Sequence, residues 1–214
     1  MKTELIPAIL TSSVEDLARK LDLVRGKTPW VQIDIMDGSF VFNQSITVDD
    51  VTEYARGIKL EAHLMVLHPE MYIDACKKAG FERIVFHYEA VPHIEVLLEK
   101  ISKAGMERGI AINPETPITS VLPYLSNIDT VLLLGVIPGL SGQMFHEPVL
   151  EKINDLQQHA KSMPIGIDGG IDLDNASRVI VAGADRLIVG SAIFGAVDPN
   201  DALKQFQSLV SPTA

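Results

Sequence analysis

Short apolar segments alternate with amphipathic segments along the whole chain. The apolar segments are rich in Ile, Val and Leu, which is typical of parallel strands covered on both faces. We expect strands over residues 5–10, 30–35, 59–65, 83–88, 108–112, 130–134, 164–167 and 186–189.

The segments between the predicted strands have the spacing of helices. One apolar face is formed by Val14, Leu17, Leu21 and Val24. A second is formed by Ile94, Leu97, Leu98 and Ile101. Ser12 and Asp172 are expected to cap helices, and Gly80 and Gly105 lie where helices should end.

Eight strand–helix units follow one another without a linker or a change of composition. Strict alternation predicts a parallel α/β fold, and eight units in a chain of 214 residues favour a (β/α)8 TIM barrel. We therefore expect residues 1–214 to form one barrel domain. The pattern alone leaves an open doubly wound sheet as the alternative.

Composition narrows the class of protein. The formal net charge is −10, and no dense run of Lys and Arg occurs, so we expect no nucleic-acid partner. A single cysteine, Cys76, rules out an internal disulfide and fits a reducing compartment. Because neither a signal peptide nor a long apolar span is evident, we expect a cytoplasmic protein without a membrane partner.

The second predicted strand ends in polar residues, where a barrel carries its chemistry. Gln32, Asp34 and Met36 share one face, and their neighbours suggest that this face points into the barrel. Burying a carboxylate is costly unless it is paired, hydrogen-bonded or bound to a metal. Asp34 is thus a candidate for catalysis or for capping a loop, whereas Asp37 is expected to shape the turn.

Two other strand ends carry candidates. His63 and Met65 share a face of the third strand, and Asp168 ends the seventh, across the barrel mouth from the second and third. A lone histidine in a strand is usually a satisfied core residue. A polar strand end of the same depth next to His63 favours a functional role instead.

The loops after the sixth, seventh and eighth strands are rich in small residues. Barrel enzymes often bind phosphate at such loops, through backbone N–H groups. Because no cationic side-chain clamp is evident, the backbone must do much of this binding. The candidates are Gly139, Ser141, Gly142, Gln143, Gly169, Gly170, Gly190 and Ser191.

Seven motifs occur in a fixed order between residues 6 and 194, and together they resemble the ribulose-phosphate 3-epimerase family. They are IDIMDG (33–38), AHLM (62–65), FHYEA (86–90), NPETP (113–117), PGLSGQ (138–143), IDGG (167–170) and VGSA (189–192).

The resemblance implies an isomerase of carbohydrate metabolism that moves a proton at carbon 3. Such an enzyme interconverts D-ribulose 5-phosphate and D-xylulose 5-phosphate, in the pentose phosphate pathway. It implies that Asp34 and Asp168 are the acid and base and that they hold a divalent metal together with His63. Met36 and Met65 would line the substrate pocket, and a homo-oligomer is compatible with the family.

Several substitutions depart from the family pattern, and two of them concern the metal and substrate sites most directly. Gln32 stands where the family has its first metal-binding histidine, and a neutral amide oxygen should weaken a zinc or iron site. Three outcomes stay open: a metal with Gln32 or water as fourth ligand, a harder ion such as manganese or magnesium, or no metal. Ala8 replaces a serine and removes a hydroxyl from the substrate side.

The expected partner is a small phosphorylated ketose, and three other readings remain. The chain could be an epimerase of another ketose phosphate, such as allulose 6-phosphate. It could be a barrel that binds a sugar phosphate without turnover. A decarboxylase or aldolase is the third reading, but similar decarboxylases carry a lysine where this chain has Met36.

Overall fold

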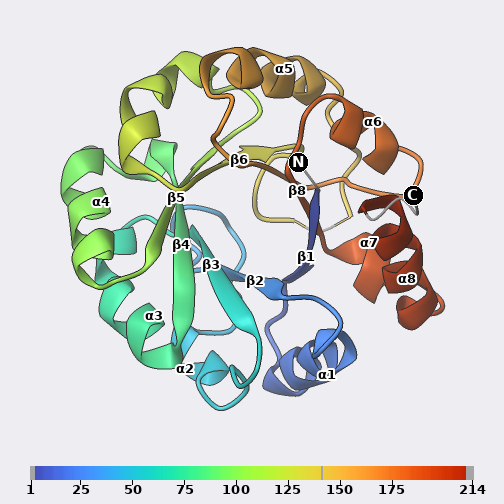
Figure 1. Cartoon of the computed structure of the whole chain (residues 1–214). Coiled ribbons are helices and arrows are strands. Elements are labelled where there is room, and N and C mark those ends of the chain that lie inside the picture. The colour runs from blue at the N-terminus through green and yellow to red at the C-terminus, as the bar shows by residue number, and fades with distance from the viewer. Residues whose placement is uncertain (1–2, 141, 211–214) are drawn as a thin grey trace.

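The computed structural model describes residues 3–140 and 142–210, and Figure 1 views it along the axis of a barrel. Eight parallel strands pair in chain order, and β8 closes the sheet against β1. The predicted barrel is confirmed, and the open-sheet alternative is wrong. The strands are β1 (Glu4–Ile9), β2 (Trp30–Met36), β3 (Lys59–Met65), β4 (Phe81–His87), β5 (Glu107–Ile112), β6 (Thr130–Leu134), β7 (Ile165–Asp168) and β8 (Arg186–Val189).

Helices form an outer ring around the strands (Figure 1). They are α1 (Val14–Val24), α2 (Val48–Val51), α3 (Ile73–Ala79), α4 (Ile94–Lys103), α5 (Val149–His159), α6 (Ala176–Val181), α7 (Ser191–Phe194) and α8 (Pro199–Val210). Between β5 and β6 the connection is made by 3-10 turns over Ile118–Ser120 and Leu122–Asn127. Among the described residues, no helix is both long enough and apolar enough to cross a membrane.

Most of the buried apolar residues pack in two separate layers. The large layer lies between the strands and the helices and includes the whole of the second predicted helix face and, of the first, Leu17, Leu21 and Val24 but not Val14. A smaller cluster contains residues of strands only and therefore fills the inside of the barrel. Its members are Ile6, Ala8, Trp30, Val85, Ala111, Leu132, Leu134 and Ile188.

Helix ends follow the local sequence, with two corrections. Gly80 and Gly105 end α3 and α4 in the left-handed region, at φ of 87° and 74°, as predicted. The cap of α6 is Asn175 instead of Asp172, because Asp172 lies in the turn before the helix, where it accepts from the backbone N–H groups of Asp174 and Asn175. The cap of α1 is Ser13 instead of Ser12, because α1 begins one residue later and the Ser13 hydroxyl accepts from the N–H of Asp16.

The amino ends of the strands hold a buried charged cluster. Glu61 accepts hydrogen bonds from Arg186 and, at 2.7 Å, from Nη1 of Arg83. Arg186 also donates to the hydroxyl of Thr130, and the Arg83 guanidinium lies 4.1 Å from the ring centre of Trp30. Burial alone would raise the pKa of Glu61, but the two guanidinium charges outweigh burial and lower it.

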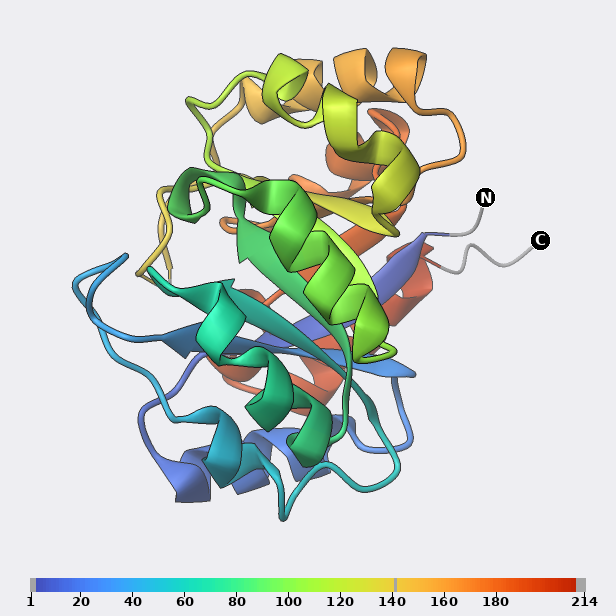
Figure 2. The ribbon, with the colours of Figure 1, turned by 90° about the vertical axis from the view of Figure 1, so that its left-hand side faces the viewer.

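The carboxyl ends of the strands open at the other side of the barrel. Figure 2 shows the loops after β2 and β6 at the left, opposite the beginning of β1. Asp37 shapes the first of these loops, as predicted, by accepting from the backbone N–H groups of Ser39, Phe40 and Leu67. The fold thus places the polar strand ends under one set of loops.

Candidate active site

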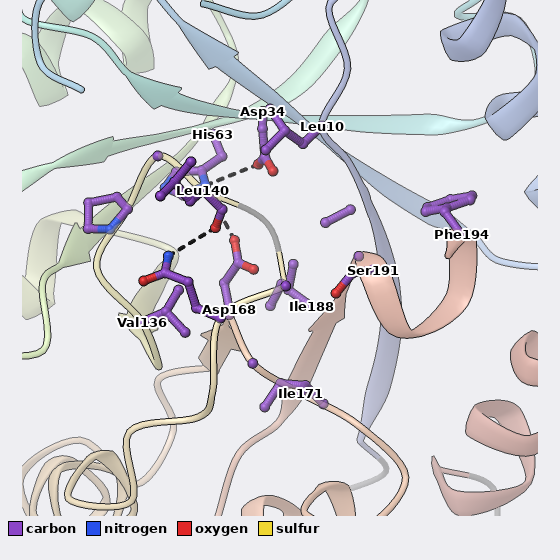
Figure 3. Close-up of a pocket in the computed structure, with 18 of the residues that line it drawn as sticks. Leu10, Asp34, His63, Val136, Leu140, Asp168, Ile171, Ile188, Ser191 and Phe194 are labelled. Atoms are coloured by element: carbon purple, nitrogen blue, oxygen red, sulfur yellow. Dashed lines mark hydrogen bonds and ion pairs between the residues drawn. The ribbon is translucent and has the colours of Figure 1, made fainter. Parts of the chain in front are cut away.

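The register of β2 and β3 places their polar residues side by side. Asp34 pairs with His63, and Met36 pairs with Met65. Nδ1 of His63 lies 3.2 Å from Oδ1 of Asp34 and 3.4 Å from Oδ2 of Asp168, which arrives from β7. Figure 3 shows these three side chains pointing into the same space.

Gln32 joins this group from one layer deeper in β2. Its side chain is fully buried, and Nε2 donates to Oδ1 of Asp34 at 2.8 Å and to Oδ2 of Asp168 at 2.7 Å. The same nitrogen lies 3.3 Å from Nδ1 of His63. Oε1 of Gln32 is buried without a hydrogen-bond partner among the described residues. The amide nitrogen is therefore the common neighbour of all three side chains.

Burial and mutual contact shift the protonation of this group. Burial raises the pKa of the Asp34 carboxyl, and the nearby charge of Asp168 adds to the effect, although His63 and Gln32 act in the opposite direction. Burial alone would lower the pKa of His63. Its hydrogen bonds to Asp168 and Asp34, together with their charges, outweigh burial and raise that pKa to about 10.

The donor set fits a divalent cation. One ligand atom each from Asp34, His63 and Asp168 lies within 4.8 Å of the other two. Tetrahedral metals with ligands about 2.0–2.2 Å away have neighbouring ligands roughly 3.4 Å apart, which agrees with the 3.2 and 3.4 Å from Nδ1 to the carboxylates. A half-turn of the Gln32 amide would direct its Oε1 at the same point and supply a fourth, oxygen ligand.

A cavity of about 310 Å³ lies above this group. That volume suits a small metabolite. Of the predicted site residues, Gln32 lies below the cavity, and Ser141 lies outside the described residues. All the others line its wall: Ala8, Asp34, Met36, His63, Met65, Gly139, Gly142, Gln143, Asp168, Gly169, Gly170, Gly190 and Ser191.

Two glycines of the cavity wall, Gly169 and Gly170, are required by close packing. Gly169 and Gly170 have φ of 99° and 70°, in the left-handed region. A Cβ at Gly170 would lie 2.7 Å from the backbone N and Cα of Phe145, and one at Gly169 would lie 2.4 Å from Cγ2 of Val136. The loops after β6 and β7 thus pack closely against each other at the mouth of the barrel.

The sequence matches the family described as "Ribulose-phosphate 3 epimerase family" over residues 4–194. It is 34% identical to "Ribulose-phosphate 3-epimerase" of Bacillus subtilis over 94% of this chain and 96% of that protein. It is 33% identical to "Ribulose-5-phosphate-3-epimerase, chloroplastic" of Arabidopsis thaliana, over 97% of this chain and 77% of that protein.

The chain belongs to the ribulose-phosphate 3-epimerase family. A solved structure agrees on the fold. That structure, of 3-hexulose-6-phosphate synthase from Salmonella typhimurium, has a TM-score of 0.77 at 13% identity, covering 97% of this chain and 98% of that one.

Two cationic residues of the epimerase-family barrel line the cavity although the sequence showed no cationic clamp. Arg19 and Lys20 come from α1. Nζ of Lys20 pairs with Asp16 at 2.7 Å, donates to the carbonyl of Leu10 at 3.0 Å, and lies 5.6 Å from the ring centre of Phe194. In the sequence, Asp16 and Lys20 form an i,i+4 pair, which is typical of a solvated helix face. The position of Lys20 on the cavity wall could therefore not be inferred from the sequence.

Proposed function

We propose that this chain is a ribulose-phosphate 3-epimerase, an isomerase that interconverts D-ribulose 5-phosphate and D-xylulose 5-phosphate. The observation that carries the proposal is the meeting of Asp34 and Asp168 below one cavity, from strands on different sides of the barrel (Figure 3). Inverting a carbon centre by proton transfer is most direct with an acid and a base on its two faces.

The two carboxyls supply that chemistry in turn. One takes the proton from carbon 3, and the electrons of the C–H bond move to carbon 2 and its oxygen, giving an enediolate. The other returns a proton to the opposite face of carbon 3, and the carbonyl at carbon 2 reforms. The raised pKa of Asp34 favours this cycle, because it brings the carboxyl nearer to neutral pH.

Stabilisation of the enediolate is the task of the group around Gln32. A divalent metal held by Asp34, His63 and Asp168 would supply positive charge next to the developing oxyanion. The side chain of Gln32 would serve either state of the site. With Nε2 inward it bridges the two carboxylates, and with Oε1 inward it is an oxygen ligand for manganese, magnesium or a weakened zinc site.

Several residues of the cavity wall support a phosphorylated ketose as the substrate. The loops at Gly169, Gly170 and Gly190 bring the backbone to the cavity, where N–H groups can bind phosphate. Lys20 adds a cation on the same wall. Met36 and Met65 are buried against the site and would limit water around the enediolate.

The test is exchange of the carbon-3 proton by NMR in D2O, with ribulose 5-phosphate, after chelation and after adding back zinc, manganese or magnesium. Exchange coupled to formation of xylulose 5-phosphate is the expected result. Loss on chelation and recovery with one ion would assign the metal, and activity indifferent to chelation would assign a metal-free site. No exchange under any condition would overturn the proposal.

Allulose 6-phosphate is the second substrate to test. Ala8 lines the cavity without the hydroxyl that the family pattern has there, which alters the substrate side of the wall. Faster exchange with the six-carbon phosphate would make this chain an epimerase of that ketose. Binding of either sugar phosphate without exchange would support the non-catalytic reading.

A further inference from the structure

His87 is a buried histidine that lies next to the site but outside the cavity. It ends β4, is fully buried, and its Nε2 lies 3.0 Å from Nε2 of His63. The two ring planes are inclined by 24° and their centres lie 5.1 Å apart, and Phe40 covers His87 from the loop after β2. Because His87 does not line the cavity wall, it acts on the chemistry only through His63.

The short contact between the two Nε2 atoms requires one hydrogen between them. One Nε2 must carry hydrogen and donate, and the other must accept. His63 directs its Nδ1 at Asp34 and Asp168. If His63 is to offer the lone pair of Nδ1 to a cation, its proton must be on Nε2, and His87 must then accept with its own Nε2.

Glu89 selects this arrangement over its reverse. When His87 accepts at Nε2, its proton is on Nδ1, which lies 3.4 Å from Oε2 of Glu89. In the reverse arrangement a bare Nδ1 would face the carboxylate, and His63 would direct a hydrogen at the cation site. Burial by itself would raise the pKa of Glu89, but the nearby Nδ1 of His87 and the hydrogen bonds from Thr116 and Asn113 lower it to about 2.

The Glu89 carboxylate is held by the loop after β5. Oε1 accepts from the backbone N–H of Asn113 at 2.8 Å and from the hydroxyl of Thr116. Lys152 of α5 fixes the same loop by donating to the carbonyls of Asn113 and Thr116. The line of contacts therefore runs from α5 and β5 through Glu89 and His87 to His63.

We infer that His87 and Glu89 are positioning residues that hold a proton of His63 on Nε2, so that Nδ1 is the nitrogen that gives up its proton to bind a cation. The inference rests on the proposed function, since it gives His63 the role of a ligand. Metal-binding histidines are commonly oriented in this way by a partner on the other ring nitrogen. Here the partner is a second histidine, which is itself oriented by a carboxylate.

The test compares His87→Leu, His87→Gln and Glu89→Gln with the unaltered protein and with Phe86→Leu. Glutamine at position 87 carries an acceptor and a donor side by side and can replace both ring nitrogens, whereas leucine has neither. Phe86 is a fully buried neighbour in β4 that belongs to the outer apolar layer and serves as the matched control. Mn²⁺ and Zn²⁺ affinities are measured by competition with a chelating dye. For each variant, kcat and KM are determined as separate constants.

We expect His87→Leu to weaken metal affinity about 10- to 100-fold. It should lower kcat by a larger factor than it changes KM. His87→Gln should restore most of the affinity, and Glu89→Gln should weaken it. Phe86→Leu should lower Tm and leave affinity unchanged. Equal metal affinity in His87→Leu and the unaltered protein would overturn the inference, as would failure of glutamine to restore it.

A second measurement separates this inference from the proposed function. In the metal-free protein, 15N NMR detects the N–H···N hydrogen bond between the two rings as a coupling between their Nε2 nuclei. The coupling, with the hydrogen on His63, is expected whether or not the protein turns over ribulose 5-phosphate. Its absence, or a hydrogen on Nε2 of His87, would overturn the inference even in an active epimerase. Absence of carbon-3 proton exchange in the unaltered protein under any condition would instead reject the proposed function.

Discussion

Nε2 of Gln32 lies 2.7 Å from Oδ2 of Asp168, a carboxylate 136 residues further along the chain. The same nitrogen bonds Asp34. One neutral amide therefore holds two acids together at the point where the family pattern places a histidine that binds a metal. This relationship makes Gln32 the residue that distinguishes the site of this chain.

Replacing Gln32 with histidine should strengthen metal binding. An imidazole nitrogen is a better ligand for zinc than an amide oxygen, so we expect a Zn²⁺ affinity at least about 10-fold higher, measured by competition with a chelating dye. Gln32→Leu is the control, because it removes the bridge between the carboxylates without adding a ligand. Equal zinc affinity in Gln32→His and the unaltered protein would contradict the assignment of this position to the metal site.

Replacing either acid should separate the two half-reactions. We expect Asp34→Asn and Asp168→Asn each to slow interconversion about 10²–10⁴-fold. Each variant should still exchange the carbon-3 proton of one ketose phosphate, since the remaining acid faces one side of the carbon. NMR in D2O, started separately from each epimer, measures both rates. Asp22→Asn, on the exposed face of α1, is the control, and exchange of both epimers by one variant would refute a two-base mechanism.

Gly170→Ala should weaken binding of the phosphate. A Cβ at this position would meet the backbone of Phe145 at 2.7 Å, so the loop after β7 must move. We expect KM for the ketose phosphate to rise about 10-fold, the equivalent of roughly 1.4 kcal/mol of lost binding.

Gly26→Ala is the matched control for that variant. Gly26 has φ of 72°, close to the 70° of Gly170, but nothing lies within 4 Å of its Cβ position. It should show the cost in stability of the left-handed backbone without a change in KM. A rise in KM of similar size in both variants would show that strain, and not the collision with Phe145, is responsible.

Glu61→Gln should destabilise the fold in a pH-dependent way. Removing the charge leaves Arg83 and Arg186 buried without this partner, which costs about 3–5 kcal/mol. The folded pKa of Glu61 lies below its ordinary value of 4.5. Its contribution is therefore complete above pH 4.5 and declines as the pH falls from there toward the folded pKa.

Urea unfolding at several pH values tests this expectation. The difference in free energy of unfolding between Glu61→Gln and the unaltered protein should be constant near neutral pH and should narrow below pH 4.5. Glu107→Gln is the control, because Glu107 also pairs with Arg83 but is about half exposed, and it should cost less than about 1 kcal/mol. A difference that widens on acidification would contradict the lowered pKa.

The strands could be predicted from sequence because parallel strands covered on both faces are short, mostly apolar segments between amphipathic ones. The start of α1 could not, since Thr11, Ser12 and Ser13 all carry hydroxyls and only the backbone decides which one caps the helix. The place of Lys20 depends on how α1 packs beside α7, which the pattern of one helix does not contain.

The site itself was predictable in part. Alternation along β2 and β3 put Gln32, Asp34 and His63 on inward faces, and the barrel order put Asp168 across from them. The position of the Gln32 amide between the acids depends on side-chain torsions that no spacing encodes. His87 lies within the FHYEA motif, but its contact with His63 becomes visible only when β3 and β4 are placed next to each other.

The pairing of β1 with β8 joins the first and last strands of the sheet. Asp34 and Asp168 are therefore brought together only when nearly the whole chain has been synthesised and the ring has closed. Helical circular dichroism can recover early during refolding from short-range contacts, whereas turnover must wait for this late, long-range step. With Asp34 and Asp168 as the proposed acid and base, recovery of turnover would report closure of the barrel, and a nascent chain that ends before β7 would lack one of the two acids however much helix it contains.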